Sequence, residues 1–303
     1  MEYLHNDREQ FLDAINLAVF KTGLEPEIVE KDYYVTMILK KLAERYDFIV
    51  FKGGTSISKC HRVISRFSED IDITIDSALS QGQKRKLKYG IVDIATELGL
   101  TIPNLDSVRS RRDYNRYELA YDSVLDRLSD TVRTEVLMET SFTEVSFPTV
   151  QLPVHSYIGD LFMEEAPDAM NQYDLNIFSM KVQGLDRTLI DKVFAICDYY
   201  LNNNVTKHSR HIYDIYKLYP LVQQNDEFRA LVREVRAVRA KASICPSAQP
   251  GVNVPAILKK IVESHVYRED YNFLTVRLLE EDVDYDQAIQ AVELIADGGM
   301  FEE

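Results

Sequence analysis

Apolar residues recur at helical spacing over the first part of the chain. A capping box at Asn6 and Glu9 opens the first such stretch, which ends near Gly23, and Pro26 opens the second. Residues four positions apart share one face of a helix, so the pattern predicts two amphipathic helices. Their apolar positions are Phe11, Ile15 and Val19 in the first and Val29, Tyr33, Met37, Ile38 and Leu42 in the second.

The next stretch, FIVFKGGTSISKCHRVISRFSEDIDITID at 48–76, mixes two kinds of pattern. A short apolar run ends at a pair of glycines, and a helical segment and a loop then lead to an alternating run. Alternation of polar and apolar residues is typical of a half-buried strand. The stretch therefore predicts strand, glycine turn, helix, loop and strand. The polar side of the second strand carries Asp70, Asp72, Thr74 and Asp76.

The rest of the pattern divides the chain in two. A helix is predicted at 80–98, and Pro153 favours an edge position for the strand-like run that contains it. The strand-like runs lie at 105–111, 115–121, 131–140, 151–158 and 176–182. From Leu185 onward the apolar spacing is helical. The sequence thus predicts an α+β domain over residues 1–183 and an α-helical domain over residues 184–303.

The glycine turn has the composition of a phosphate site. Gly53 and Gly54 let the backbone turn sharply and approach a ligand closely. Thr55 and Ser56 supply hydroxyl groups and a helix N-cap, and the free N–H groups of a helix N-terminus favour phosphate. Lys52 flanks the turn. These five residues are therefore predicted to bind a nucleotide.

The alternating run supplies a candidate metal site. Side chains at i and i+2 of a strand point the same way, so Asp70 and Asp72 would repel each other unless a cation lay between them. Hard carboxylate oxygens suit Mg²⁺, and metal ions stabilise the attacking and leaving oxygens of phosphoryl transfer. Lys59, on the intervening helix, either reaches a triphosphate or is a solvated lysine. The alternative for the whole stretch is a solvent-facing acidic strand after an ordinary turn.

The Gly-Gly-Thr turn followed by Asp-x-Asp resembles the DNA polymerase β-like nucleotidyltransferase superfamily, with a longer gap than usual between Gly54 and Asp70. The fuller strings KGGTSISK and RFSEDIDIT resemble the AbiEii/AbiGii-type toxin nucleotidyltransferases. The resemblance implies a polymerase β-like core with a mixed sheet, followed by a helical domain. It also implies an enzyme that uses Mg²⁺ or Mn²⁺ to move a nucleoside monophosphate from an NTP to an acceptor, with release of pyrophosphate.

Further site residues follow from this resemblance. Ser68 matches the family's active-site serine, and the superfamily has a third carboxylate on a neighbouring strand. In the strand predicted at 131–140, Glu139 fits the family register best, and Glu135 is the alternate. Lys192 matches the family's lysine in a Glu/Asp-Lys-hydrophobic-x-Ala run, where a lysine neutralises charge on the phosphates.

Two more segments resemble the family. RHIYDI at 210–215 follows the pattern Arg-Asp-hydrophobic-Tyr-Asp-Leu, except that His211 stands where the first aspartate is usual. Asp214 matches the second aspartate and would anchor either Lys192 or the incoming nucleotide. The run EKDYY at 30–34 resembles a Lys-Asp-Tyr element, and its helical position favours a salt-bridged helix surface.

The resemblance also implies the toxin of a toxin–antitoxin or phage-defence system, with a cognate antitoxin and with tRNA as acceptor. Three basic clusters suit phosphate, although each is also explained as a solvated helix face or a charged strand edge. They are Lys84, Arg85, Lys86 and Lys88; Arg109, Arg111, Arg112 and Arg116; and Arg229, Arg233, Arg236 and Arg239. The alternative functions are modification of a protein hydroxyl or a small molecule, and non-catalytic nucleotide binding in a regulatory protein.

Composition narrows the class of protein. The 303 residues carry a net charge of −14, which argues against broad non-specific binding to DNA. The sequence shows no signal peptide and no apolar run of transmembrane length, so we expect neither a membrane protein nor an exported one. Cys60, Cys197 and Cys245 lie far apart without metal-ligand spacing, as expected of reduced thiols in a cytoplasmic protein.

Overall fold

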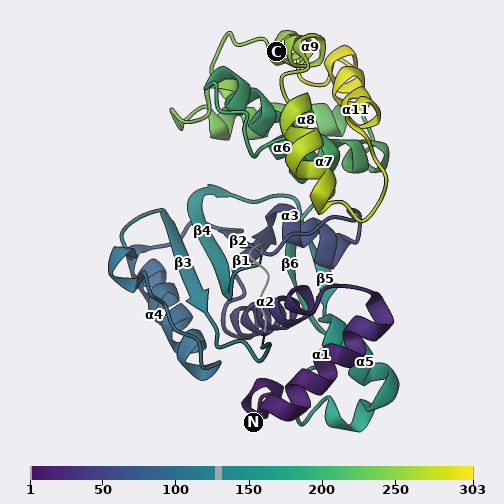
Figure 1. The fold of residues 1–303 in the computed structure, drawn as a ribbon. Helices are drawn as coiled ribbons and strands as arrows, with labels where there is room; N and C mark the ends of the chain where they lie inside the picture. Colours follow the sequence, from purple (N-terminus) through teal and green to yellow (C-terminus); the bar gives the residue numbers. More distant parts are fainter. Residues whose placement is uncertain (1, 127–131, 303) are drawn as a thin grey trace. The chain divides into compact units, whose positions relative to one another are not determined.

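The computed structural model describes residues 2–126 and 132–302. The chain forms two compact units, the first made of residues 1–60 and 69–182 and the second of residues 61–68 and 183–303. The first unit contains the strands, and the second is helical (Figure 1). Thr131, where one strand is predicted to begin, lies outside the described residues.

The first unit is built on a six-stranded mixed sheet in the order β3-β4-β2-β1-β6-β5 (Figure 1). Strand β1 is antiparallel to β2 and parallel to β6, while β4 is parallel to β2 and antiparallel to β3. The mixed sheet and the helices that follow it confirm the predicted fold class. The strands are β1 (Ile49–Lys52), β2 (Ile71–Ile75), β3 (Tyr114–Ala120), β4 (Glu135–Val145), β5 (Thr149–Val154) and β6 (Phe178–Gln183).

Strand β2 lies inside the sheet, between β4 and β1. Ile71, Ile73 and Ile75 are buried on one face, as the alternation predicts. Thr74, on the opposite face, is also buried. The prediction of a half-buried strand is therefore wrong at Thr74, because both faces of β2 are covered there.

Helix α2 (Pro26–Arg45) is the most buried helix of the first unit. Figure 1 shows it between α4 (Gln81–Glu97) and α5 (Tyr157–Glu165), and it contacts both of them and β4. Helix α1 (Arg8–Thr22) packs on α2 and α5. Its N-cap is Asp7, which accepts a hydrogen bond from the Gln10 N–H, and not the predicted Asn6.

Two of the predicted strands differ in the structure. The run predicted at 105–111 contains a short 3₁₀ turn, Leu105–Ser107, and then a loop. The run predicted at 151–158 ends at Val154, because Ser156 caps α5 by accepting a hydrogen bond from the Gly159 N–H. The first part of that run is strand β5, which lies at an edge of the sheet, where its proline is tolerated.

The second unit packs helices around a shared apolar core. Helix α7 contacts α6 and α11, and α9 contacts α11. The helices of eight or more residues are α6 (Leu185–Leu201), α7 (Arg210–Leu218), α8 (Asp226–Arg239), α9 (Val254–Ser264) and α11 (Tyr285–Asp297). Over the described residues, none of the helices combines the length and apolar character needed to cross a bilayer. Cys60, Cys197 and Cys245 are buried and are not joined by disulfide bonds.

Candidate active site

The glycine turn follows β1 without a connecting loop. The short helix α3 (Gly53–Ser56) begins directly after Lys52 and continues as a π-helical turn to His61. Gly53 has a φ of +81°, and a Cβ added to it would lie 1.9 Å from Oδ2 of Asp72. Only glycine combines this left-handed backbone with an approach that close. The backbone of the turn therefore lies against the carboxylate of Asp72.

The hydroxyl residues of the turn are less accessible than the sequence predicts. Thr55 and Ser56 are both buried. The hydroxyl of Ser56 donates to the carbonyl of Gly53 at 2.9 Å. The N-cap position is occupied by Lys52, whose side chain makes no capping hydrogen bond. The prediction that Thr55 and Ser56 cap this helix is therefore wrong, because both residues lie inside its first turn.

Two of the predicted acidic residues are neighbours in the sheet. Asp72 on β2 is the register partner of Glu139 on β4, 67 positions further along the chain, and the strands are parallel. Asp70 directly precedes the first residue of β2. The hydroxyl of Tyr114 donates to Glu139, and burial together with this hydrogen bond raises the pKa of Tyr114 to about 12. On the other side of β4, Glu139 faces Arg116 on β3.

The alternate, Glu135, lies in a different environment. It is the first residue of β4, where its register partner is Ala120 on β3. The pairing between β4 and β2 begins only at Met138. Glu135 also forms an ion pair with Arg133 at 3.3 Å. It therefore lies before the part of β4 that pairs with β2.

The carboxylates of this site suit a hard divalent cation. Over residues 2–126 and 132–302, no three His, Cys, Asp or Glu side chains gather closely enough to hold a metal ion by themselves. Mg²⁺ usually binds one or two protein carboxylates and completes its shell with water and substrate phosphates. The adjacent carboxylates of Asp72 and Glu139, with the glycine backbone beside Asp72, fit that mode of binding.

Lys59 is neither solvated nor free to extend. Its ammonium group forms an ion pair with Asp32 of α2, and the Lys59 side chain is 7% exposed. Asp32 also accepts a hydrogen bond from the Tyr157 N–H at 3.0 Å. Of the alternatives for Lys59, the solvated lysine is therefore wrong. The ion pair connects the helical turn after the glycines to α2.

The EKDYY segment is buried, which corrects the prediction of a helix surface. Glu30 is fully buried and accepts hydrogen bonds from the Ser123 hydroxyl and the Val124 N–H. Lys31 is 2% exposed and forms an ion pair with Glu69 at 2.6 Å. The charges are paired as predicted, but inside the first unit. Lys31 therefore holds the residue next to Asp70.

Ser68 does not lie on β2. The strand begins at Ile71, three positions further along the chain. Ser68 is the last residue of the segment 61–68, which belongs to the second unit.

Lys192 and Asp214 meet in the second unit. The Lys192 ammonium lies 2.8 Å from Oδ2 of Asp214, which is fully buried. Arg66 donates from Nε and from a terminal nitrogen to the same carboxylate, at 2.6 and 2.9 Å. Lys192 also donates to Nδ1 of His211 at 3.2 Å. The structure thus places Asp214 as the anchor of Lys192, and Arg66 as a residue that the sequence reasoning missed.

The charges of this cluster shift each other's pKa. Burial alone would raise the pKa of Asp214, but Arg66 and Lys192 outweigh it and hold that pKa far below its usual range. Burial, reinforced by Arg66, lowers the pKa of Lys192. Burial and the charge of Lys192 hold the pKa of His211 well below its ordinary value, so its ring is neutral. A neutral ring can accept the hydrogen bond from Lys192 at Nδ1.

The sequence offered one indication that Arg66 belongs to the site. Arg66 opens the string RFSEDIDIT, which carries the family resemblance. A lone arginine before an acidic run predicts only a surface ion pair, whereas here the guanidinium is 1% exposed. Lys192 is buried as well, with 8% of its surface exposed.

The third basic cluster of the sequence lies on α8, and its four arginines do not share one exposed surface. Arg236 donates to the carbonyl oxygen of Val252 at 2.5 Å, and Arg239 donates to Asp198 at 3.0 Å. Arg229 forms an ion pair with Asp226 at 3.6 Å. Arg233 is exposed. Two of the four arginines, Arg236 and Arg239, are therefore bonded within the second unit, and the four do not form one continuous basic surface.

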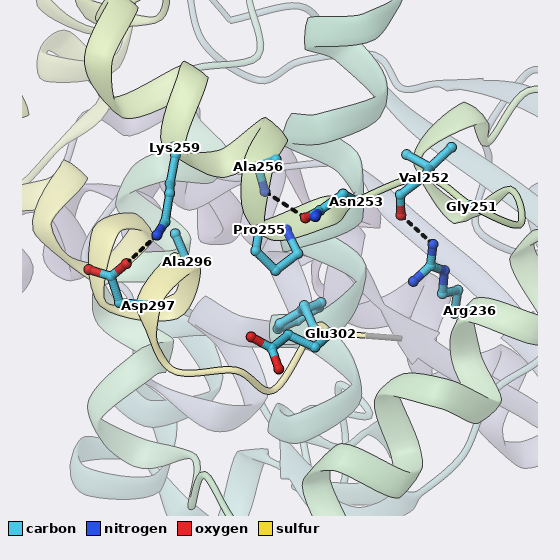
Figure 2. Close-up of a pocket in the computed structure, with 11 residues that line it drawn as sticks. Arg236, Gly251, Val252, Asn253, Pro255, Ala256, Lys259, Ala296, Asp297 and Glu302 are labelled. Atoms are coloured by element: carbon cyan, nitrogen blue, oxygen red, sulfur yellow. Dashed lines mark hydrogen bonds and ion pairs between the residues drawn. The ribbon is translucent and has the colours of Figure 1, made fainter.

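A cavity of about 510 Å³ lies in the second unit, between the start of α9 and the end of α11 (Figure 2). Several of its polar side chains have partners: Arg236 bonds to Val252, and Lys259 pairs with Asp297 at 2.8 Å. Asn253 caps α9 by accepting a hydrogen bond from the Ala256 N–H. None of the predicted site residues lines this cavity.

Comparison with known proteins gives a family match and similar solved structures. A family model described as "Nucleotidyl transferase AbiEii toxin, Type IV TA system" matches residues 38–293. Among solved structures, MenT4, a nucleotidyltransferase toxin from Mycobacterium tuberculosis H37Rv, is similar with a TM-score of 0.58 at 15% sequence identity. The similarity covers 95% of this chain and 90% of that one, and at this identity it shows the fold alone. A search of curated protein sequences gives no significant match.

The family match spans the glycine turn, the acidic strands and the helices of the second unit. The resemblance seen in the sequence is thereby confirmed. The chain belongs to the AbiEii family of nucleotidyl transferase toxins of type IV toxin–antitoxin systems.

Proposed function

We propose that the protein transfers a nucleoside monophosphate from an NTP to a hydroxyl of its acceptor, releases pyrophosphate and depends on a divalent cation, Mg²⁺ or Mn²⁺. The observation that carries this proposal is the register of Asp72 and Glu139 on parallel strands, with the Gly53 backbone against Asp72. Carboxylates that can bind a divalent cation are the groups that metal-assisted phosphoryl transfer requires.

Asp70, Asp72 and Glu139 would hold the cation. When bound, it stabilises negative charge on the phosphate and leaving oxygens. Glu139 is preferred over Glu135 because the register puts it beside Asp72. Glu139 can also accept the proton of the attacking hydroxyl, and Tyr114 holds its carboxylate in position.

The segment from Lys52 to Ser56 would bind the triphosphate through its backbone N–H groups. The ion pair between Lys59 and Asp32 supports this segment from α2 and makes Lys59 a positioning group in the proposal. The roles of Ser68, Lys192 and Asp214 in the reaction rest on the family resemblance. For Lys192 that role is neutralisation of charge on the phosphates.

RNA, with tRNA as the first candidate, is the acceptor that we propose. Membership of the family implies an NTP substrate and an antitoxin partner. The resemblance to RNA-modifying toxins supports an RNA acceptor and a role in phage defence. A protein hydroxyl or a small molecule is the alternative acceptor.

The test is incubation of the purified protein with each of the four labelled NTPs, Mg²⁺ and either total RNA or total protein. We expect label in the RNA fraction, release of pyrophosphate, and loss of both when EDTA replaces Mg²⁺. The Asp72→Asn variant serves as the inactive control. Label in protein alone would refute the RNA acceptor, and no label with pyrophosphate absent would refute the transferase.

A further inference from the structure

Lys31 of α2 carries a positive charge into the interior of the first unit. Its side chain is 2% exposed, and its ammonium group lies 2.6 Å from Oε2 of Glu69. The same ammonium group donates to the carbonyl oxygen of Arg133 at 3.2 Å. One buried group thus contacts two segments that are far apart in the chain.

These two segments lead directly into the strands that carry the acidic residues. Glu69 lies two residues before Ile71, where β2 begins, and Arg133 lies two residues before Glu135, where β4 begins. The two strands are parallel, so both begin at the same end. Lys31 therefore connects β2 and β4 at the end where each strand begins.

The register between β2 and β4 depends on a short regular pairing. Residues 71–73 of β2 pair with residues 138–140 of β4, and the register then shifts before Ile75. One of these pairs is Asp72 with Glu139. A slip of one residue would turn Asp72 to the other face of the sheet, because the side chains of a strand alternate between faces. The connection through Lys31 lies where it opposes such a slip.

Lys31 acts on the strands and not on the carboxylates. The apolar core to which α2 contributes also contains Ile71 and Met138. Neighbouring residues of a strand point to opposite faces, so Asp72 and Glu139 lie on the face away from this core. Lys31 can therefore influence a bound cation only through the position of the strands.

Stability does not account for this buried charge. Removing an ammonium group from water is costly, and apolar residues of similar volume often stabilise a fold equally well or better. The best-attested use of a buried polar or charged group is to specify one register among several. The contacts of Lys31 at the start of both strands match that use.

The next residue of the helix supports the other half of the site. Asp32 forms an ion pair with Lys59, which lies in the π-helical turn after the glycines. It also accepts a hydrogen bond from the Tyr157 N–H at 3.0 Å. Consecutive residues of a helix point in directions about 100° apart, so Lys31 and Asp32 reach different segments.

We propose that Lys31 and Asp32 are positioning residues of the nucleotidyl-transfer site. Lys31 maintains the register of the strands whose carboxylates bind the cation, and Asp32 maintains the turn that binds the triphosphate. The inference rests on the proposed function, because it assigns roles at the same site. It predicts two different defects for two adjacent residues.

The first test measures binding of Mn²⁺ alone, from the electron paramagnetic resonance signal of the free ion. We expect Lys31→Met to weaken binding about 10-fold to 100-fold, the usual loss when a residue that orients metal ligands is removed. The matched control is Lys40→Met, which removes another buried ammonium group of α2, one that pairs with Asp174 at 2.6 Å. Lys40→Met and Asp32→Asn should bind Mn²⁺ as the wild type does.

The second test measures pyrophosphate release while Mg²⁺ and NTP are varied separately. Lys31→Met should raise the Mg²⁺ concentration needed for the half-maximal rate by about 10-fold or more. Asp32→Asn should instead raise the KM for NTP at saturating Mg²⁺ by up to about 100-fold, because the turn is misplaced. A general loss of packing would change both requirements together in each variant.

A third measurement applies even if Lys31→Met does not fold. The double variant Lys31→Met, Glu69→Gln leaves no carboxylate without its cation, so we expect it to fold. Hydrogen exchange of the amides at 71–73 and 138–140 should still be faster than in Lys40→Met, because the strand starts are no longer connected. Equal exchange in the two would contradict the role of Lys31.

Failure of this proposal can be distinguished from failure of the proposed function. If the wild type binds Mn²⁺ and releases pyrophosphate but Lys31→Met matches Lys40→Met in both tests, the positioning role is refuted and the transferase stands. Parallel changes in the Mg²⁺ and NTP requirements of Lys31→Met and Asp32→Asn would also refute it. If the wild type neither binds Mn²⁺ nor releases pyrophosphate, the proposed function fails and the positioning roles fail with it.

Discussion

Arg66 and Asp214 form a two-point ion pair between positions 148 residues apart in the chain, at 2.6 and 2.9 Å. Both side chains are essentially inaccessible to solvent, at 1% and 0% exposure. The pair joins the segment 61–68 to α7, and it explains why this segment belongs to the second unit although residues 1–60 and 69–182 belong to the first. Lys192 completes the cluster on the same carboxylate.

Replacing Arg66 should strongly destabilise the second unit. Arg66→Ala leaves Asp214 with Lys192 as its remaining cationic ion-pair partner among the described residues. Breaking a buried ion pair costs about 3–5 kcal/mol in the free energy of unfolding. Urea denaturation followed by circular dichroism measures this loss. Arg233→Ala, an exposed arginine of the same unit, is the control and should change stability by less than about 0.5 kcal/mol. A loss of similar size in both variants would contradict the role of the pair.

Acid should destabilise the protein through His211. Burial and Lys192 hold the pKa of His211 well below 6.5, so below that pH the unfolded chain binds a proton that the folded chain does not. Stability contributed by the neutral ring is therefore complete above about pH 7 and falls as the pH drops below 6.5. The groups around the ring are Lys192, Asp214, Arg210 and Arg66.

The free energy of unfolding should therefore depend less steeply on pH in the His211→Gln variant. We expect the slope to fall by up to about 1.4 kcal/mol per pH unit between pH 6.5 and 5. Urea denaturation at several pH values provides the measurement. His265→Gln changes an exposed histidine and is the control. If the two variants lose stability with pH in the same way as the wild type, His211 is not the group that titrates.

Gly53→Ala should damage the site more than the fold. The new Cβ would meet Oδ2 of Asp72 at 1.9 Å, and the φ of +81° adds strain of about 1–3 kcal/mol for a residue with a side chain. Gly99→Ala is a matched control, since Gly99 has a φ of +66° but no atom within 4 Å of the added Cβ. Both variants lose stability, but only Gly53→Ala should lose nucleotidyl transfer. Transfer that survives in Gly53→Ala would show that the position of Asp72 is not critical.

Glu139 and Glu135 can be separated by single substitutions. Glu139→Gln removes the carboxylate that faces Asp72, so we expect transfer to fall about 100-fold or more. Glu135→Gln changes a residue that pairs with β3 and Arg133, and it should leave activity near that of the wild type. Pyrophosphate release at saturating NTP and Mg²⁺ measures both. The reverse result would assign the third carboxylate to Glu135.

Local pattern in the sequence determined the elements around the glycine turn. The alternation at 71–75 corresponds to β2, and the apolar run before Gly53 corresponds to β1. The helical spacing of apolar residues between Pro26 and Leu42 corresponds to α2. These features follow from periodicity and turn chemistry, which act between residues close in the chain. The strings around Gly53 and Asp72 were also specific enough to indicate the family.

Only the tertiary structure decided which distant residues meet. The sequence left Glu135 and Glu139 open as partners of the aspartates, and the register of β4 with β2 puts Glu139 beside Asp72. Arg236 and Arg239 have the spacing of a surface stripe, yet both bond inside the second unit. Arg66 pairs with Asp214, which lies 148 positions further along the chain. Periodicity predicts which face of a helix or strand carries a given side chain. Which residues contact that face depends on how helices and strands that are distant in the sequence pack together.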